Sequence, residues 1–179
     1  MKLTMDEFST HAFATTPADP EHLRRAMRYW ATGVAVVTSS HEGVVHGMTV
    51  SSFTSVSLSP PQVLISLAHS TRTYTLVKAS RVFGVSLLAV GQEHISDLFA
   101  GRTKGTDDRL AGLETFTLVT GVPLLKEALA HYDCRVIATF TSGTHTIFIG
   151  GVLAVTSNEH GTPLIYYDRK YHSLGGKQP

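Results

Sequence analysis

Short hydrophobic runs separated by polar turns dominate the chain from residue 34 onward. The runs at 34–38, 62–67 and 81–90 are rich in β-branched residues and too short for core helices, which predicts buried strands. Two longer runs, 129–141 and 144–156, flank Ser142-Gly143 and predict a long hairpin. In the first of these, Cys134 and its alternate neighbours form an apolar face, with His131, Asp133 and Arg135 on the polar face.

Helical spacing occurs in only three places. Asp19-Pro20-Glu21 is a helix start, because it combines a capping oxygen, a proline in the first turn and an acidic residue. The apolar stripe that follows is predicted to continue to Gly33, where the helix ends; it consists of Leu23, Ala26, Met27 and Trp30. A short helix capped by Ser70 or Thr71 is expected to run through Ala79, and another is expected from residue 92 to 100.

Many short strands, few helices and no regular alternation of strand and helix predict a mainly β protein. The expected fold is a closed or sandwiched antiparallel barrel with a few short flanking helices. We expect a flexible lead-in over residues 1–18 and a single domain over 19–179. The charged, glycine-rich segment 101–112 is long enough to be a functional flap.

The segment 45–61 is unusual because it carries seven hydroxyl side chains and still keeps a strand-like alternation of apolar residues. Phe53 shares one face with Ser55 and Ser57, and a strand is expected to end at Pro60-Pro61. Such a segment offers many backbone and hydroxyl hydrogen bonds, so we interpret it as the floor of a site for a flat polar ligand.

Composition bears on the assembly, the possible partners and the location of the protein in the cell. Charged residues make up 16% of the chain against a usual fraction of about 25%, which suggests that a second copy covers part of the surface. The net charge of +1 argues against a nucleic-acid or membrane-surface partner, and Arg24, Arg25 and Arg28 are interpreted as a solvated helix face. A lone cysteine, no secretion signal and no membrane-length apolar run predict a cytoplasmic protein.

The sequence lacks the motifs of nucleotide-binding α/β folds, of serine hydrolases and of metal sites. The sequence has no G-x-G-x-x-G, no G-x-x-x-x-G-K-[ST] and no G-x-S-x-G, and its ten histidines show no metal-ligand spacing, so no metal site is expected. Cys134 is interpreted as a packing residue. His145, in a tight G-T-H turn, is either incidental or functional. Residues 70–73 fit either a phosphate site with Arg72 or an ordinary helix cap.

From about Leu23 to Leu174 the sequence resembles the flavin reductase-like family with the split-barrel flavin-binding fold. The resemblance rests on ordered motifs, of which the second is the most specific: L-R-R-A-M-R-Y-W-A-T-G-V-A-V-V-T (23–38), H-G-M-T-V-S-S-F-T-S-V-S-L-S-P-P (46–61), R-V-F-G-V-S-L-L (81–88), D-R-L-A-G (108–112), H-T-I-F-I-G (145–150) and P-L-I-Y-Y-D-R-K-Y-H (163–172).

The resemblance implies roles for matching positions. The isoalloxazine would lie on Gly47, Met48, Thr49, Val50, Ser51 and Ser52, through backbone amides and the hydroxyls of Thr49, Ser51 and Ser52. The ribityl chain would lie along Ser66, Leu67 and Ala68, and the phosphate on Arg72 and Thr73. Phe99 and Lys104 would approach the cofactor; the nicotinamide side would involve His145, as the catalytic residue, with Arg169 and Tyr171.

The implied fold is a Greek-key split barrel, and the implied activity is hydride transfer from NADH, with NADPH possible, to FMN or FAD. A flavin-dependent oxygenase would receive the reduced flavin by diffusion, and the enzyme would be a homodimer. Three positions depart from the family pattern, Ser86, Thr144 and Gly151, and they bear on nucleotide preference. A flavin-binding electron carrier without a nucleotide site and a flavin-dependent oxidase are the alternatives.

Overall fold

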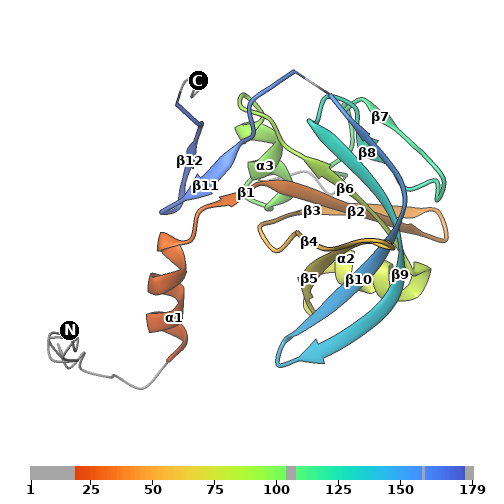
Figure 1. Cartoon of the computed structure of the whole chain (residues 1–179), viewed down its shortest axis with the longest axis horizontal. Helices are drawn as coiled ribbons and strands as arrows, with labels where there is room; N and C mark the ends of the chain where they lie inside the picture. Colours follow the sequence, from red (N-terminus) through yellow and green to blue (C-terminus); the bar gives the residue numbers. More distant parts are fainter. Residues whose placement is uncertain (1–18, 104–107, 159, 176–179) are drawn as a thin grey trace, which may run out of the picture.

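The computed structural model describes residues 19–103, 108–158 and 160–175 (Figure 1). The lead-in predicted over residues 1–18 lies outside them. The elements, in chain order, are α1 (Pro20–Ala26), the 3-10 turn η1 (Met27–Tyr29), β1 (Thr32–Gly33), β2 (Ala35–His41), β3 (Val44–Val50), β4 (Thr54–Leu58), β5 (Pro61–Ala68), α2 (Arg72–Ser80), β6 (Val82–Leu87), α3 (Glu93–Phe99), β7 (Thr115–Phe116), β8 (Leu124–Leu125), β9 (Ala130–Ser142), β10 (His145–Ser157), β11 (Ile165–Tyr167) and β12 (Lys170–His172).

The main sheet has seven strands in the order β3-β2-β6-β9-β10-β5-β4, and every pair in it is antiparallel. The mainly β, antiparallel prediction is therefore confirmed, as is the hairpin of β9 and β10. Within the described residues no ladder joins β3 to β4 or β5, so the sheet is not a closed barrel. It curls instead: the Ser52 hydroxyl, just after β3, donates to the Ser66 carbonyl of β5 at 2.9 Å.

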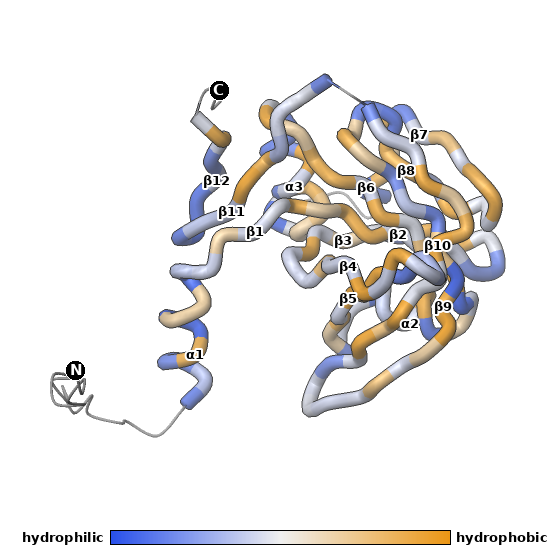
Figure 2. The backbone as a smooth tube through the Cα atoms, in the orientation of Figure 1, coloured by the Kyte–Doolittle hydropathy of each residue, from blue (hydrophilic) through white to orange (hydrophobic). Residues whose placement is uncertain are grey.

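The helix α2 covers the open end of this curl. Its N-cap is Thr71, whose hydroxyl accepts from the Tyr74 N–H, and Arg81 ends it in a left-handed conformation. Its Thr73, Leu76 and Val77 are buried, and Val77 belongs to the main core with residues of β2, β5, β6, β9 and β10. The apolar colour of these strands is visible along the tube in Figure 2. The helix thus takes the place of the missing strand pairing.

A second core lies between α3 and a small sheet of order β1-β11-β12. Phe99 of α3, Val36 of β2 and Leu164 are buried there, with Tyr166 and Tyr171 packed against them. This core holds the C-terminal hairpin β11–β12 against α3, at the end of the molecule where α1 also lies (Figure 1).

The first helix is shorter than predicted. It ends at Ala26, a 3-10 turn follows, and Gly33 lies in β1 rather than at a helix end. The cause is tertiary: Thr32 and Gly33 pair with Tyr166 and Ile165 of β11, which pulls residues 30–33 into an extended conformation. The predicted apolar stripe is also exposed within this chain, since α1 has no buried residues.

Two side chains of the predicted polar face of β9 are buried instead of facing solvent. Segment 117–128 covers its first half, so His131 and Asp133 are buried. The Asp133 carboxylate accepts from the N–H and hydroxyl of Thr120, and the His131 ring bonds the Leu125 carbonyl. Sequence alternation did not reveal this covering segment, because its strand β8 and the strand β7 just before it have two residues each.

Candidate functional site

The hydroxyl-rich segment lies where β3 ends and the chain leaves the main sheet. Residues 51–53 join β3 to β4 and belong to neither strand. Within the part of the chain that the structure describes, the N–H groups of residues 51–53 make no hydrogen bond. Ser51 is exposed and Ser52 and Phe53 are half-buried, so this row of N–H groups is accessible to the nitrogen and oxygen edge of a flat ligand.

The hydroxyl protons in this segment are partly committed to other groups. The Thr49 hydroxyl donates to the Ser96 carbonyl at 2.7 Å, and the Ser52 hydroxyl donates to Ser66. These two side chains therefore tie the segment to α3 and β5. The Ser51 side chain is exposed and, within the described residues, has no hydrogen-bond partner. The backbone amides, more than the hydroxyls, are thus the available donors.

Gly47 allows α3 to approach β3 closely. A Cβ at Gly47 would lie 2.7 Å from a ring carbon of Phe99, which is fully buried. The Arg109 guanidinium donates to both the Gly47 carbonyl, at 3.1 Å, and the Phe99 carbonyl, at 2.7 Å. Phe99 therefore supports the segment from behind, and Arg109 fixes the end of the 101–112 loop to it.

Two hollows meet at this segment. The inner hollow, of about 160 Å³, is lined by Thr49, Val50 and Ser51 together with Ser96 of α3, Arg102 just after that helix, and Tyr166 and Tyr171 of the C-terminal hairpin. The outer hollow, of about 520 Å³, is lined by Ser51, Ser52 and Phe53 with residues 30–33. Ser51 lines both, so a flat ligand on residues 49–52 would lie across their shared edge.

The predicted ribityl residues lie beside His145. In the β5–β10 ladder Ala68 is opposite His145, Leu67 is opposite Thr146 and Ser66 is opposite Ile147. The His145 side chain is exposed, and its Nδ1 lies 2.9 Å from the Thr144 hydroxyl. The structure therefore brings His145 next to Ala68, at the end of strand β5. The Thr144 hydroxyl is the hydrogen-bond partner of the His145 ring.

The predicted phosphate residues form a cationic corner with two further side chains. Thr73 is fully buried, and its hydroxyl lies 2.8 Å from Nδ1 of His46. Burial, together with the nearby charges of Arg109 and Arg72, lowers the pKa of His46 to about 4. His46 is therefore neutral at pH 7, and the two guanidinium groups supply the positive charge at this corner. Thr73 has a neighbour inside the protein, whereas Arg72 is exposed.

Tyr171 and Arg169 lie on the C-terminal hairpin at the other end of the molecule. The Tyr171 hydroxyl donates to Asp97 at 2.7 Å, and Arg102 donates to the same carboxylate oxygen. The hydrogen bond from Tyr171, followed by the hydrogen bond and the charge of Arg102, lowers the pKa of Asp97. This network holds Tyr171 in the inner hollow beside Thr49.

The nicotinamide residues predicted together are not brought together within one chain. Figure 1 shows the tip of the β9–β10 hairpin, where β10 begins with His145, far from β12. Lys104 lies outside the described residues. The structure adds to the site several residues that sequence reasoning missed: His46, Ser96, Asp97, Arg102 and Arg109. Two of them had a signal in the sequence, since His46 opens the quoted motif 46–61 and Arg109 lies within the quoted motif D-R-L-A-G.

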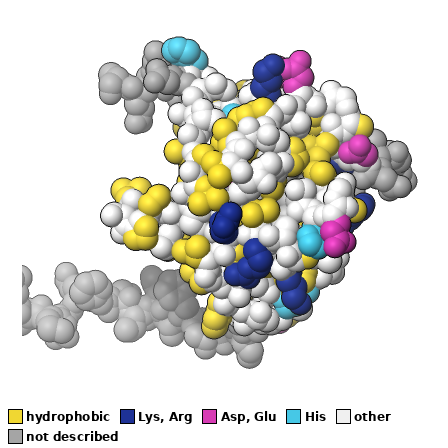
Figure 3. All heavy atoms as spheres, turned by 90° about the vertical axis from the view of Figure 1, so that its right-hand side faces the viewer, with side chains coloured by type: hydrophobic (Ala, Val, Ile, Leu, Met, Phe, Trp, Pro, Cys, Tyr) yellow, Lys and Arg dark blue, Asp and Glu magenta, His cyan; other side chains and the backbone are white. Residues whose placement is uncertain are grey.

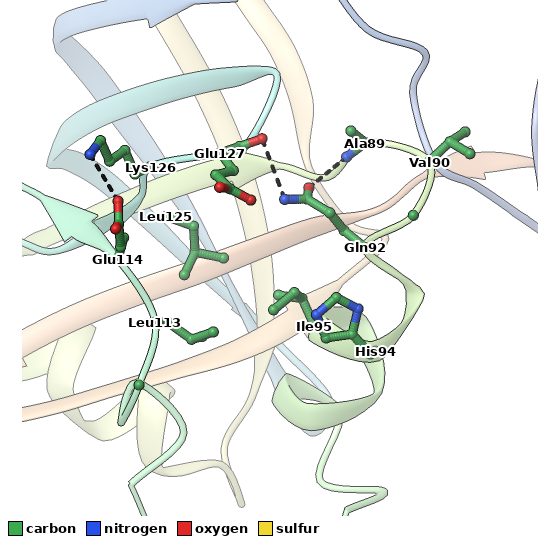
Figure 4. Close-up of a pocket in the computed structure, with 12 residues that line it drawn as sticks. Ala89, Val90, Gln92, His94, Ile95, Leu113, Glu114, Leu125, Lys126 and Glu127 are labelled. Carbon is green, nitrogen blue, oxygen red and sulfur yellow. Dashed lines mark hydrogen bonds and ion pairs between the residues drawn. The ribbon is translucent and has the colours of Figure 1, made fainter.

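A separate cavity of about 480 Å³ opens between α3 and β7–β8 (Figure 4). Leu113, Leu125 and Ile95 form its apolar wall, and an ion pair of Glu114 with Lys126 lies at its rim. The Gln92 amide is fixed between the Ala89 N–H and the Glu127 carbonyl. None of the predicted flavin or nicotinamide residues that the structure describes lines this cavity.

The described residues give no support for a metal site, a reactive cysteine or a membrane-spanning helix. They contain no group of three or more His, Cys, Asp or Glu side chains placed to hold a metal ion. Burial raises the pKa of the Cys134 thiol to about 12, which keeps it protonated and unreactive at neutral pH. No helix in the described part of the chain is long and apolar enough to cross a membrane.

Known proteins resemble this chain over most of its length. Residues 27–175 match the family described as "Flavin reductase like domain". A relative from Rhizobium rhizogenes, "FMN reductase (NADH) RutF 2", is 38% identical over 89% of this chain and 95% of its own. The flavin reductase of styrene monooxygenase from Pseudomonas putida S12 has a TM-score of 0.78 at 37% identity, with 88% of this chain and 99% of that chain covered.

A further solved structure holds pieces of both cofactors. It is the NADH:FAD oxidoreductase SgcE6 of Streptomyces globisporus C-1027, in complex with NAD and FAD fragments. Its TM-score is 0.82 at 33% identity, covering 92% of this chain and 98% of that chain.

Proposed function

The chain belongs to the flavin reductase like family, and on this premise we propose that it is an NADH-dependent flavin reductase that supplies reduced flavin to an oxygenase. The observation that carries the proposal is the row of uncommitted N–H groups at residues 51–53, on the segment that the sequence resemblance assigns to the isoalloxazine. The relatives are NADH-dependent reductases of flavin, and one serves a styrene monooxygenase.

The residues present fit a flavin. The amides of residues 51–53 face the hydrogen-bonding edge of the ring, and donors aimed at that edge favour the negative charge that develops on reduction. The flavin, when bound, supplies the hydride-accepting ring, and NADH supplies the hydride. Ser66, Leu67 and Ala68 line the ribityl chain, and Arg72 holds the phosphate with the help of the second guanidinium at Arg109.

His145 orients the nicotinamide in this proposal. Its ring is exposed beside Ala68, and the Thr144 hydroxyl at 2.9 Å fixes its orientation without adding a charge. A neutral partner in place of a carboxylate leaves the imidazole free to donate to or accept from a carboxamide. We assign it a positioning role, because the hydride transfer itself needs no protein acid.

The proposed assembly is a homodimer. On β4, β9 and β10 large apolar side chains are exposed, among them Leu58 at 90% and Phe140 at 66%. Figure 3 shows one face of the molecule, on which hydrophobic side chains gather in patches and several Lys and Arg side chains lie beside them. A second copy would cover such a surface, and it would also allow His145 of one chain to approach the C-terminal hairpin of the other.

We further propose that the curled sheet is the split barrel of this family and that residues 19–179 form one flavin-binding domain. The cytoplasm is the proposed location, which the single, buried Cys134 supports. FMN and FAD both remain substrates in this proposal, since the described site holds one phosphate corner and the relatives include reductases named for each flavin.

Anaerobic mixing of the protein with NADH and either flavin tests the activity. We expect the absorbance of oxidised flavin to bleach at a rate proportional to protein concentration. His145→Ala should raise the KM for NADH by about tenfold, the cost of one lost hydrogen bond, and leave the Kd for flavin unchanged. The matched control is His160→Ala, because that histidine is exposed and lines neither the inner nor the outer hollow.

Three outcomes would contradict the proposal in different ways. Absence of bleaching with flavin bound would identify an electron carrier. Bleaching with unchanged NADH kinetics in His145→Ala would remove the assigned role of His145. A flavin that stays bound through purification and is reduced only by another organic substrate would identify an oxidase.

A further inference from the structure

The cavity between α3 and the small sheet of β7 and β8, which we call the α3 cavity, is formed by three separate segments of the chain. Its lining residues come from segments 89–95, 112–114 and 125–127, and its volume is about 480 Å³ (Figure 4). Pockets that hold small organic ligands measure about 300–1,000 Å³, so the α3 cavity is large enough for one. The described residues to which the proposed function assigns a role do not line it.

One side of the α3 cavity is apolar and belongs to the second core. Ile95 and Leu125 are buried members of that core, and Leu113 packs against it. These three aliphatic side chains present a fixed apolar surface to the cavity. A flat hydrocarbon ring lying on this surface would remove apolar area of both the protein and the ligand from water, which favours binding.

Hydrogen bonds between the three segments hold the walls of the α3 cavity in place. The Gln92 side chain accepts from the Ala89 N–H at 2.8 Å and donates to the Glu127 carbonyl at 3.3 Å, so it joins the first segment to the third. The Lys126 N–H donates to the Glu114 carbonyl at 3.0 Å and joins the second segment to the third. A site that is already formed loses less conformational entropy on binding than one that has to close.

The charged side chains of the α3 cavity leave one negative charge in excess. They are two carboxylates, Glu114 and Glu127, and one ammonium group, Lys126, which pairs with Glu114 at 2.8 Å. The hydrogen bond and charge of Glu114, and then the charge of Glu127, raise the pKa of Lys126, so one ammonium group lies near both carboxylates. Glu127 itself makes no ion pair within the described residues. The remaining ionisable side chain of the lining, His94, is exposed.

The Glu127 carboxylate lies beside the apolar wall. In Figure 4 its side chain points from the backbone toward Leu125 and Gln92, and so toward the cavity. A carboxylate next to an aliphatic surface suits a cation with an apolar body, because one ligand can then pair with the charge and cover the surface. An anionic ligand would meet the excess negative charge instead.

We propose that the α3 cavity binds a small aromatic amine. The ring of the amine lies against Ile95, Leu113 and Leu125, and its ammonium group donates to the Glu127 carboxylate. This class of ligand is neither a flavin nor a pyridine nucleotide, so the site is separate from the one that the proposed function uses.

Three probes with the same phenyl ring and different charges test the class of ligand. At neutral pH phenethylamine is a cation, 2-phenylethanol is neutral and phenylacetate is an anion. In NMR titrations of the full-length protein we expect phenethylamine to bind most tightly and phenylacetate least tightly. Any other order of the three affinities, or no binding of phenethylamine at millimolar concentration, would overturn the proposal.

Substitution of Glu127 tests the contact with the ammonium group. Glu127→Gln should weaken phenethylamine binding about tenfold, as expected for one charge-assisted hydrogen bond, and leave 2-phenylethanol binding unchanged. The matched control is Glu93→Gln, because Glu93 is an acidic residue of α3 that does not line the cavity. Equal losses of phenethylamine affinity in the two variants would remove Glu127 as the partner of the amine and with it the proposal.

Substitution of Leu113 tests the position of the ring. Leu113 is only half-buried, so Leu113→Ala keeps the core that Ile95 and Leu125 form. It should weaken phenethylamine and 2-phenylethanol binding by the same factor, roughly fivefold, because both rings lose the same apolar contact. Unchanged binding of both probes would contradict the proposed position of the ring.

Amide chemical shifts locate the bound probe. Phenethylamine should shift the amide resonances of residues 89–95, 112–114 and 125–127. Shifts confined to residues 47–53 would place the amine on the candidate flavin segment and would contradict the α3 cavity as its site. These titrations contain neither flavin nor NADH, so their outcome does not depend on whether the protein reduces flavin.

Discussion

At the scale of single residues, the candidate site depends on the absence of a side chain at Gly47 as much as on the side chains around it. A Cβ there would lie 2.7 Å and 2.9 Å from two ring carbons of Phe99, and a buried ring has little room to retreat. Family resemblance pointed to both residues. Their packing gives the reason: glycine lets α3 approach β3, and Arg109 then bonds both carbonyls.

The lowered pKa of His46 predicts how the free energy of unfolding changes with pH. Its pKa is lowered from 6.5 to about 4, so between these values the unfolded chain binds a proton that the folded chain does not. The free energy of unfolding should therefore fall as pH falls from about 6.5 to 4. After discounting for partial exposure, we expect this contribution to be about 1–2 kcal/mol.

His46→Gln removes this titration and keeps a polar group near Thr73. Urea unfolding at pH 7 and pH 4.5 should show a smaller difference in the variant than in the wild type. His160→Gln, at an exposed position, should retain the wild-type difference. An identical pH dependence in His46→Gln would show that His46 does not carry the effect.

At the scale of elements, two helices with similar starts have different importance. Asp19 caps α1 and Thr71 caps α2, each by accepting from an N–H three residues later. Yet α1 has no buried residues, whereas α2 buries Thr73, Leu76 and Val77 under the curl of the sheet. The sequence predicts both starts equally well, and only the packing separates their roles.

Removing each cap should show this difference. Thr71→Ala should lower the free energy of unfolding by about 1 kcal/mol, because α2 belongs to the cooperative core. Asp19→Ala should change it by less than about 0.3 kcal/mol, because α1 can fray without exposing buried surface. Urea denaturation followed by circular dichroism measures both, and equal losses would place α1 in the core.

At the scale of the whole molecule, curling of the sheet creates the site. The strands β3 and β5 stand far apart in the sheet order, yet the bond of Ser52 with Ser66 joins them. The candidate flavin segment, residues 47–53, lies at this junction, between the inner and outer hollows and beside α3. An exposed apolar surface on β4, β9 and β10 remains, which is the basis of the proposed homodimer.

Sedimentation velocity tests the homodimer. The wild type should sediment as a dimer, and Phe140→Lys should shift it toward the monomer, because a charge buried between two apolar surfaces is unfavourable. Val90→Lys is the matched control, since Val90 is an exposed apolar residue outside β4, β9 and β10. A wild type that sediments as a monomer at micromolar concentration would contradict the proposed assembly.

The sequence by itself determined the fold class and most of the strands, because alternation and β-branched runs reflect local geometry directly. The hairpin around Ser142-Gly143 and the cap at Asp19 were readable for the same reason, as was the second cap at Ser70 or Thr71, which the structure assigns to Thr71. The ordered motifs also assigned the flavin to residues 47–52, and that assignment stays a prediction. These features depend on neighbouring residues in the chain, so a linear pattern suffices to predict them.

Only the tertiary structure decided which distant residues meet. It ended the first helix early, because β1 pairs with β11, and it buried His131 and Asp133 under a segment with almost no pattern of its own. It brought Glu127 to Ile95 and Leu113 in one cavity, which joins three separate segments of the chain. Pairing and packing between segments far apart in the chain leave no period in the sequence, which is why such groupings had to be seen in space.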